Sequence, residues 1–196
     1  MSSKNINTGN VPVEQQAPQP PLTPGDVPAP VLALKRLEAL VGEWTTEIVH
    51  PTVQPNPICG RRRFDWLTKS NQGTGGFLVQ YDEVEHPDFP DSVTLIGVDA
   101  DAPADVFTYH YFDSRGVERI YAMSLRDGVW KFWRDAPGFS QRFTGTFSAD
   151  AHTITASIEM SCDGAQWEHD FALTLTKVEA NNPAPARPVE ARKSAQ

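Results

Sequence analysis

A long succession of strand-like segments most limits what this chain can fold into. After Gly42 the sequence alternates short runs rich in Val, Ile, Thr and aromatic residues with Gly, Pro and Asp, which is typical of antiparallel β-structure. Ten such segments are predicted, at residues 43–49, 61–69, 75–84, 92–99, 106–113, 117–126, 129–135, 139–148, 152–161 and 166–178. Ten antiparallel strands without an intervening helix tend to close into a barrel, because closure removes the exposed strand edges. The sequence therefore predicts an all-β, up-and-down antiparallel barrel.

The turns between these segments predict how neighbouring strands pair. Asp127-Gly128 has the chemistry of a two-residue hairpin, in which both positions take positive φ, and this turn pairs Met123 with Phe132. A three-residue turn at 114–116 pairs Phe107 with the same Met123. Two separate turn assignments thus put apolar side chains on one face of the sheet, which we predict to be the barrel interior.

The last two segments are joined by a second Asp-Gly pair. If Asp163-Gly164 is also a two-residue hairpin, Ile158 faces His169 and the apolar residues of both strands share one side. This register predicts that the imidazole of His169 points into the barrel, flanked at two-residue spacing by Trp167 and Phe171.

A short amphipathic helix is expected before the first strand. Leu34, Leu37 and Leu40 recur at helical spacing after Pro30, and Gly42 follows, so the helix should pack its apolar side across one end of the barrel. We expect one barrel domain over residues 31–178. The flanking residues, 1–30 and 179–196, are rich in proline and contain no aromatic residue, which predicts disordered arms.

Charge and composition exclude several classes of function. The net charge is −8, and an acidic domain is poorly suited to nucleic-acid binding, which depends on basic surface. The Arg61–Arg63 run is interpreted as a solvated strand end. No apolar stretch approaches a membrane span or a secretory signal, and the two cysteines, Cys59 and Cys162, form no zinc spacing. A cytoplasmic location is expected by default.

The segment from Leu37 to Trp44 leads a helix into a Gly-x-Trp first strand, Gly42-Glu43-Trp44. In this it resembles the calycin superfamily, which contains lipocalins, fatty-acid-binding proteins and nitrobindins. In that superfamily a basic residue of the last strand packs across the tryptophan, and Lys177 is placed to do so. Residues 86–92, 111–116 and 167–171 also resemble a group of uncharacterised bacterial calycin-like proteins. The resemblance, which spans about residues 31–178, implies a barrel that holds its ligand inside.

Strand parity predicts which side chains a ligand would meet. Most inward positions are apolar, but a few polar groups converge there, which is the usual form of a small-molecule site. The projected interior also includes Phe64, Phe77, Tyr81 and Phe143. The candidate ligand-binding residues are His169, Arg134, Tyr109, Tyr121 (beside Tyr109 in the predicted register), Gln141, Trp66, Trp130 and Phe171. The alternative is that the aromatic residues fill the barrel completely.

His169 carries the most specific hypothesis. The resemblance to nitrobindins, which hold haem iron through a histidine of the last strand, implies that His169 could be an axial ligand, since neutral imidazole binds haem iron and an apolar pocket suits a porphyrin. The nitrobindin Gly-x-Trp-x-Gly opening is not kept, because Thr45 and Thr46 follow Trp44. The other interpretation is a core histidine bonded to a tyrosine or water. No other cofactor and no other metal site is expected.

Arg134 is the second candidate, since a buried guanidinium needs an anionic partner. Fatty-acid-binding proteins use interior Arg and Tyr side chains for a ligand carboxylate, and the resemblance offers Arg134 that role. The alternatives are an ion pair with Asp113 or Asp135, or a side chain that reaches solvent at the barrel mouth.

No catalytic motif is present, so binding of a small apolar or amphipathic molecule is favoured over catalysis. One alternative is a haem protein that acts on nitrogen oxides. A second is a cofactor-free isomerase or cyclase in which Tyr109, Tyr121 and His169 act as acid and base. A third is an interaction module with a solidly packed interior.

Overall fold

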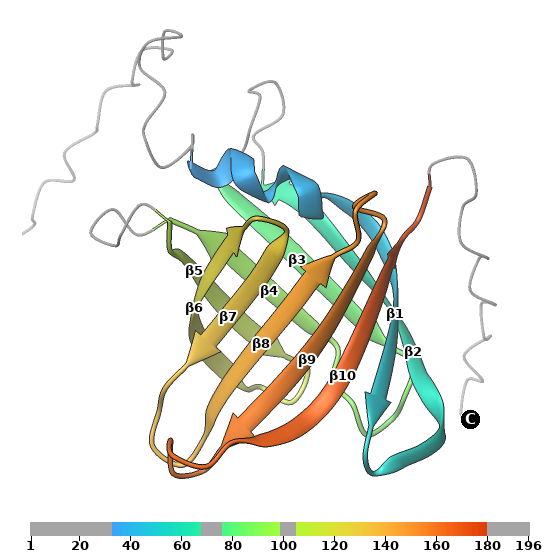
Figure 1. The fold of residues 1–196 in the computed structure, drawn as a ribbon, viewed down its shortest axis with the longest axis vertical. Helices are drawn as coiled ribbons and strands as arrows, with labels where there is room; N and C mark the ends of the chain where they lie inside the picture. Colours follow the sequence, from blue (N-terminus) through green and yellow to red (C-terminus); the bar gives the residue numbers. More distant parts are fainter. Residues whose placement is uncertain (1–32, 68–75, 99–104, 180–196) are drawn as a thin grey trace, which may run out of the picture.

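The computed structural model describes residues 33–67, 76–98 and 105–179. Ten antiparallel strands form a closed barrel (Figure 1), as the sequence predicts. The strands are β1 (Gly42–His50), β2 (Val53–Leu67), β3 (Phe77–Val84), β4 (Ser92–Gly97), β5 (Phe107–Asp113), β6 (Glu118–Arg126), β7 (Val129–Arg134), β8 (Ser140–Phe147), β9 (Thr153–Ser161) and β10 (Glu168–Lys177). β2 begins well before the predicted segment, and the other nine match their predictions closely.

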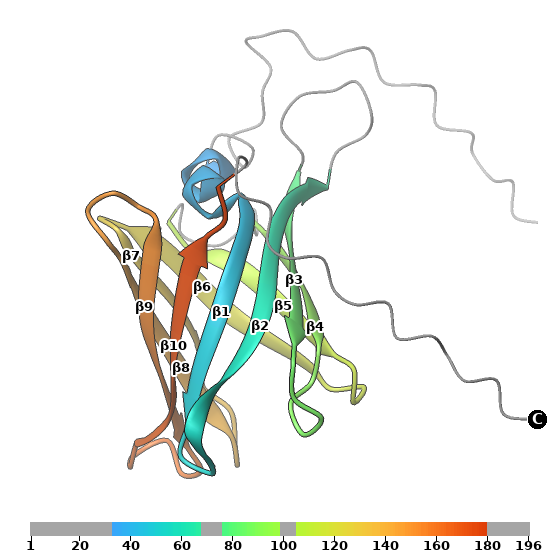
Figure 2. The same cartoon turned by 90° about the vertical axis from the view of Figure 1, so that its right-hand side faces the viewer.

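Each strand pairs with its neighbours in the sequence, and β1 closes the barrel by pairing with both β2 and β10. Figure 2 shows β1 lying between these two strands. Every strand that the structure describes therefore has partners on both sides, so closure leaves no open sheet edge among them.

Two turns have the predicted register. Asp127 and Gly128 both take positive φ, 51° and 72°, which is the conformation of a two-residue hairpin whose twist matches that of its strands. Met123 pairs with Phe132 across this hairpin and with Phe107 across the β5–β6 turn. The interior face predicted for β5, β6 and β7 is therefore confirmed.

The predicted hairpin at Asp163-Gly164 is wrong. Of these two residues only Gly164 takes positive φ, 74°, and Asp163 instead accepts hydrogen bonds at Oδ1 from the backbone N–H groups of Ala165 and Gln166, both at 2.8 Å. This carboxylate-capped loop is longer than a hairpin turn, so Trp167 precedes β10 and the pairing of β9 with β10 shifts.

A β-bulge in β10 completes that change. His169 pairs with Glu159 and Phe171 pairs with Ile158, so Asp170 is an extra residue on its strand. A bulge of this kind breaks the alternation of side chains. His169 is consequently exposed on the outer face, whereas Asp170 and Phe171 both line the interior.

The predicted N-terminal α-helix is replaced by a short 3-10 segment, η1 (Lys35–Leu40), whose leucines Leu37 and Leu40 are buried. η1 lies across one end of the barrel (Figure 1). The predicted arm at 1–30 lies outside the described residues, as does the predicted arm at 179–196 apart from its first residue. Among the residues that are described, no helix is long and apolar enough to span a bilayer.

The end of the barrel beneath η1 is packed around Trp44. Its indole Nε1 donates a 2.8 Å hydrogen bond to the carbonyl oxygen of Leu40, and Nζ of Lys177 lies 5.1 Å from its ring centroid. The contact between Lys177 and Trp44 that the resemblance implies is therefore present. Trp44 is almost fully buried, together with Phe64 and Leu37.

The strand parity assigned to β3 is wrong. Phe77 and Tyr81 are exposed by 47% and 37% on the outer face, whereas Leu78 and Gln80 are buried. Arg62 in β2 also faces the interior, where its side chain is only 13% exposed, instead of forming part of a solvated strand end. Polar groups of β2 and β3 therefore enter the barrel in places where the sequence predicts aromatic rings or solvent.

Candidate functional site

A cavity of about 340 Å³ occupies the half of the barrel away from η1. We call this half the open end; it carries the β1–β2, β3–β4, β5–β6, β7–β8 and β9–β10 connections (Figure 1). The volume of the cavity is in the range of small-molecule sites. The apolar part of the lining includes Ile48, Phe132, Phe143, Ile158, Phe171 and Leu173.

Arg62 and Asp82 form an ion pair inside the barrel, in which Nε of Arg62 donates to Oδ1 of Asp82. The other carboxylate oxygen, Oδ2, accepts from Gln80 Nε2 at 2.5 Å and from Ser92 Oγ at 3.1 Å. The hydroxyl of Tyr109 donates to Gln80 Oε1 at 3.2 Å. These residues satisfy one another, which removes most of the cost of burying two charges.

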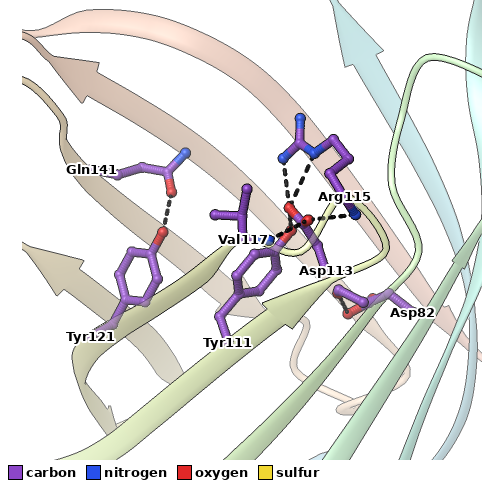
Figure 3. A network of polar contacts seen from close by, with 8 residues as sticks. Asp82, Tyr111, Asp113, Arg115, Val117, Tyr121 and Gln141 are labelled. Carbon is purple, nitrogen blue, oxygen red and sulfur yellow. Dashed lines mark hydrogen bonds and ion pairs between the residues drawn. The ribbon is translucent and has the colours of Figure 1, made fainter.

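A second set of polar side chains lines the cavity from β6, β8 and β10. The hydroxyl of Tyr121 donates to Gln141 Oε1 at 2.8 Å, and Gln141 Nε2 donates to Asp170 Oδ2 at 3.2 Å. The other oxygen of Asp170 lies 3.8 Å from Nε2 of His50 in β1. Figure 3 shows the Tyr121 hydroxyl pointing toward Gln141.

Asp113 anchors the β5–β6 turn at the open end (Figure 3). Its buried carboxylate accepts hydrogen bonds from the Arg115 guanidinium, at 3.2 Å to Nε and 2.6 Å to the terminal nitrogen, and from the Tyr111 hydroxyl at 3.0 Å. The backbone N–H groups of Arg115 and Val117 also donate to it. Burial alone would raise the pKa of Asp113, but these donors outweigh it and lower the pKa to about 2.

A stack of three aromatic rings forms one side of the cavity. The ring of Phe132 lies between Tyr109 and Phe143, with centroid distances of 4.7 and 4.5 Å and interplanar angles of 13° and 6°. Tyr121 meets Tyr109 edge-on at 5.8 Å. Offset and edge-on contacts of this kind fix ring orientation, so this side of the cavity is preformed.

Burial controls the chemistry of the two interior tyrosines. Removal from water raises the pKa of Tyr109 to about 12, since the charged phenolate is disfavoured in an apolar surrounding. Burial likewise raises the pKa of Tyr121. Both hydroxyls therefore remain protonated at neutral pH, where they act as hydrogen-bond donors.

Four of the eight predicted site residues line the cavity, namely Tyr109, Tyr121, Gln141 and Phe171. Trp130 lies behind them, fully buried against Phe132 and Phe143. Trp66 is at the other end of the barrel, where its indole Nε1 donates to Glu38 Oε2 at 3.0 Å. Neither Trp130 nor Trp66 is among the residues that line the cavity.

His169 and Arg134 are not placed as the sequence predicts. His169 is on the outer face, where Nδ1 lies 3.3 Å from Ser157 Oγ, so the chain does not offer it as an axial ligand for a haem in the cavity. Arg134 donates a 2.7 Å hydrogen bond to the carbonyl oxygen of Phe139 in the β7–β8 loop, and neither predicted ion-pair partner binds it. Within the described ranges, no group of three or more metal-ligating side chains occurs.

Several polar residues of the lining were not predicted from the sequence, among them His50, Arg62, Asp82, Arg119 and Asp170. Strand parity was sufficient to predict Arg119, because it precedes Tyr121 by two positions on the same face of β6. Arg62 is likewise two positions before the buried Phe64. No alternation pattern predicts Asp170 in the lining, because its inward position depends on the bulge in β10.

No protein-family model matches this chain, and no curated protein matches it. Among solved structures, the chain is similar to Rv2717c from M. tuberculosis, with a TM-score of 0.55 and 14% identity over 75% of this chain and 98% of that chain. It is also similar to a Nostoc punctiforme protein of unknown function from the DUF3598 family, with a TM-score of 0.46 and 13% identity. That match covers 72% of this chain and 49% of the Nostoc chain. At these identities the likeness to Rv2717c establishes a shared fold and nothing further.

Proposed function

We propose that this protein is a calycin-like barrel that binds a small amphipathic molecule in the cavity at its open end. The observation that carries the proposal is the cavity itself, about 340 Å³ in volume, whose lining combines apolar side chains with oriented polar groups. A solidly packed interaction module would have filled this space with side chains. Displacing water from the apolar lining supplies the driving force for binding, and the polar groups supply orientation.

The calycin assignment rests on details around the first strand. Gly42-Glu43-Trp44 opens β1, η1 packs across that end of the barrel, and Lys177 of the last strand lies over Trp44. The up-and-down order of ten strands agrees with this assignment.

Binding is favoured over acid–base catalysis because the three groups proposed for catalysis do not all face the cavity. Tyr109 and Tyr121 face the cavity, but His169 lies on the outer face. A general base should have a pKa near the working pH, and burial moves the pKa of Tyr109 to about 12. The two tyrosines are suited to donating hydrogen bonds to a bound molecule.

A fluorescence titration with N-phenylnaphthylamine, an uncharged apolar probe, tests the proposal. Val84 is half-buried and lines the cavity from β3, so the indole of Val84→Trp would occupy part of the space. Val93 on the outer face of β4 is 39% exposed, and Val93→Trp is the matched control. We expect the wild type and Val93→Trp to bind the probe with equal affinity, and Val84→Trp to bind about tenfold more weakly.

Failure of the wild type to bind the probe, or equal binding by Val84→Trp and the wild type, would contradict the proposal. Native mass spectrometry of protein isolated from its own host gives a second readout, since a ligand that co-purifies should be absent from Val84→Trp.

A further inference from the structure

Three arginines line the cavity, and they differ in their partners. Arg62 is paired with Asp82, and Arg115 is paired with Asp113. Arg119, near the start of β6, lies over the ring of Phe139, with its Cζ 4.2 Å from the ring centroid. Within the part of the chain that the structure describes, no carboxylate is within ion-pair distance of Arg119.

The contacts of Arg119 orient its guanidinium without neutralising it. The stacking contact with the ring of Phe139 holds the side chain, and it leaves the positive charge unpaired. A guanidinium in such a position is a ready partner for an anion, because it offers several donors in a fixed plane.

We propose that the ligand of this cavity is an anion that binds with its charged group at the open end, against Arg119, and its apolar part toward the aromatic stack of Tyr109, Phe132 and Phe143. The proposal rests on the cavity being a ligand site, as argued above, and adds the charge and orientation of the ligand. A carboxylate or sulfonate on an apolar body has the required chemistry.

The depth of the cavity is less suited to a charged group. The hydroxyls of Tyr109 and Tyr121 already donate to Gln80 and Gln141, and Arg62 is bound by Asp82. An anion placed there would have to break the Arg62–Asp82 pair and leave a buried carboxylate uncompensated, which is costly.

The charges around the open end favour the β6 side for the anion. Arg115 lies in the β5–β6 turn with its side chain 54% exposed, and Tyr111, the cross-strand partner of Arg119, donates to the same carboxylate that binds Arg115. Asp170 of β10 also lines the cavity, but its carboxylate already accepts a hydrogen bond from Gln141 and lies 3.8 Å from Nε2 of His50. Two guanidinium groups therefore lie on one side of the open end.

A matched pair of probes separates charge recognition from burial. Anilinonaphthalenesulfonate and N-phenylnaphthylamine share one ring system, and only the first carries a sulfonate. We expect the wild type to bind the sulfonate more tightly. Arg119→Gln should weaken sulfonate binding about tenfold, the effect of losing one charge-assisted hydrogen bond, and should leave N-phenylnaphthylamine binding unchanged.

Arg126→Gln is the control, since Arg126 is in the same strand but pairs with Asp105 at the η1 end, and it should bind both probes like the wild type. Arg115→Gln gives a second test, with a smaller loss for the sulfonate alone. Equal affinity of the wild type for both probes, no loss in Arg119→Gln, or an equal loss for both probes would overturn the inference. If N-phenylnaphthylamine does not bind the wild type, the proposed function itself fails.

Discussion

Lys177 of the last strand lies over the indole ring of Trp44 in the first strand, with Nζ 5.1 Å from the ring centroid. The same ammonium group donates a 3.4 Å hydrogen bond to the carbonyl oxygen of Ala39 in η1. One side chain therefore connects η1 with the two strands that close the barrel.

Replacing this lysine should loosen that end of the barrel. We expect Lys177→Met to lower the free energy of unfolding by about 1 kcal/mol, the usual worth of one cation–π contact at a partly exposed site, and to lower Tm by roughly 2–4 °C. Thermal unfolding followed by circular dichroism measures the change. Lys131→Met, on the exposed outer face of β7, is the control. A Tm shift no larger than that of the control would contradict the role assigned to Lys177.

A larger loss of stability is expected when the ion pair between Arg62 and Asp82 is broken. Asp82→Ala removes the carboxylate and leaves a guanidinium inside the barrel without a counter-ion, so we expect a loss of about 3–5 kcal/mol in urea unfolding. Combining Arg62→Met with Asp82→Leu should restore part of that loss, because no uncompensated charge remains. If Asp82→Ala costs less than about 1 kcal/mol, the pair is not the buried interaction described here.

The hydrogen bonds around Asp113 predict a dependence of stability on acid. The pKa of this carboxyl is about 2 in the folded protein and near 3.9 in an unfolded chain. A carboxyl with a lowered folded pKa stabilises the fold above its unfolded pKa, and that contribution is lost as the pH falls through the folded value. Asp113→Asn should therefore reduce stability at pH 6, and the difference from the wild type should shrink between about pH 4 and 2.

Urea unfolding at a series of pH values measures this difference. Asp135→Asn, at an exposed position after β7, serves as the control, because its carboxylate is not buried in the fold. A difference for Asp113→Asn that stays constant down to pH 2 would mean that the carboxylate charge contributes nothing.

Tyr109 should titrate well above an ordinary tyrosine, because burial raises its pKa to about 12. Ultraviolet absorbance of the tyrosinate, compared between the wild type and Tyr109→Phe, should show the missing signal near pH 12 instead of near pH 10. Since the folded pKa is the higher one, the stability that Tyr109 contributes should be lost as the pH rises between these two values. A missing signal centred near pH 10 would show that the phenol is open to solvent.

The sequence was sufficient to predict the barrel because local rules determine most of it. Alternating polarity gave the ten strands, and the Asp127-Gly128 turn gave the correct register for Met123 and Phe132. Hairpin chemistry and side-chain alternation act over a few residues, so they can be read without knowing the rest of the fold.

The site was harder to predict because its polar residues depend on partners from distant strands. Gln80 and Asp82 face inward in β3, where interactions with Tyr109 and Arg62 offset the free-energy cost of burying polar groups. The aromatic ring of Tyr81 instead faces outward beneath Arg63. Judged from β3 alone, the opposite face is expected to point inward, because it carries the aromatic rings of Phe77 and Tyr81. Long-range compensation of buried polar groups is therefore the step that a single strand cannot reveal.

The bulge at Asp170 makes the carboxylate at the open end separable from the rest of β10. The residues on either side, His169 and Phe171, pair with consecutive residues of β9. Deleting the codon for Asp170 would therefore leave a regular strand in which all the remaining side chains keep their present faces. The insertion or deletion of one residue in a related barrel would thus add or remove a carboxylate in the cavity. A sequence alignment without gaps would show that event as a substitution.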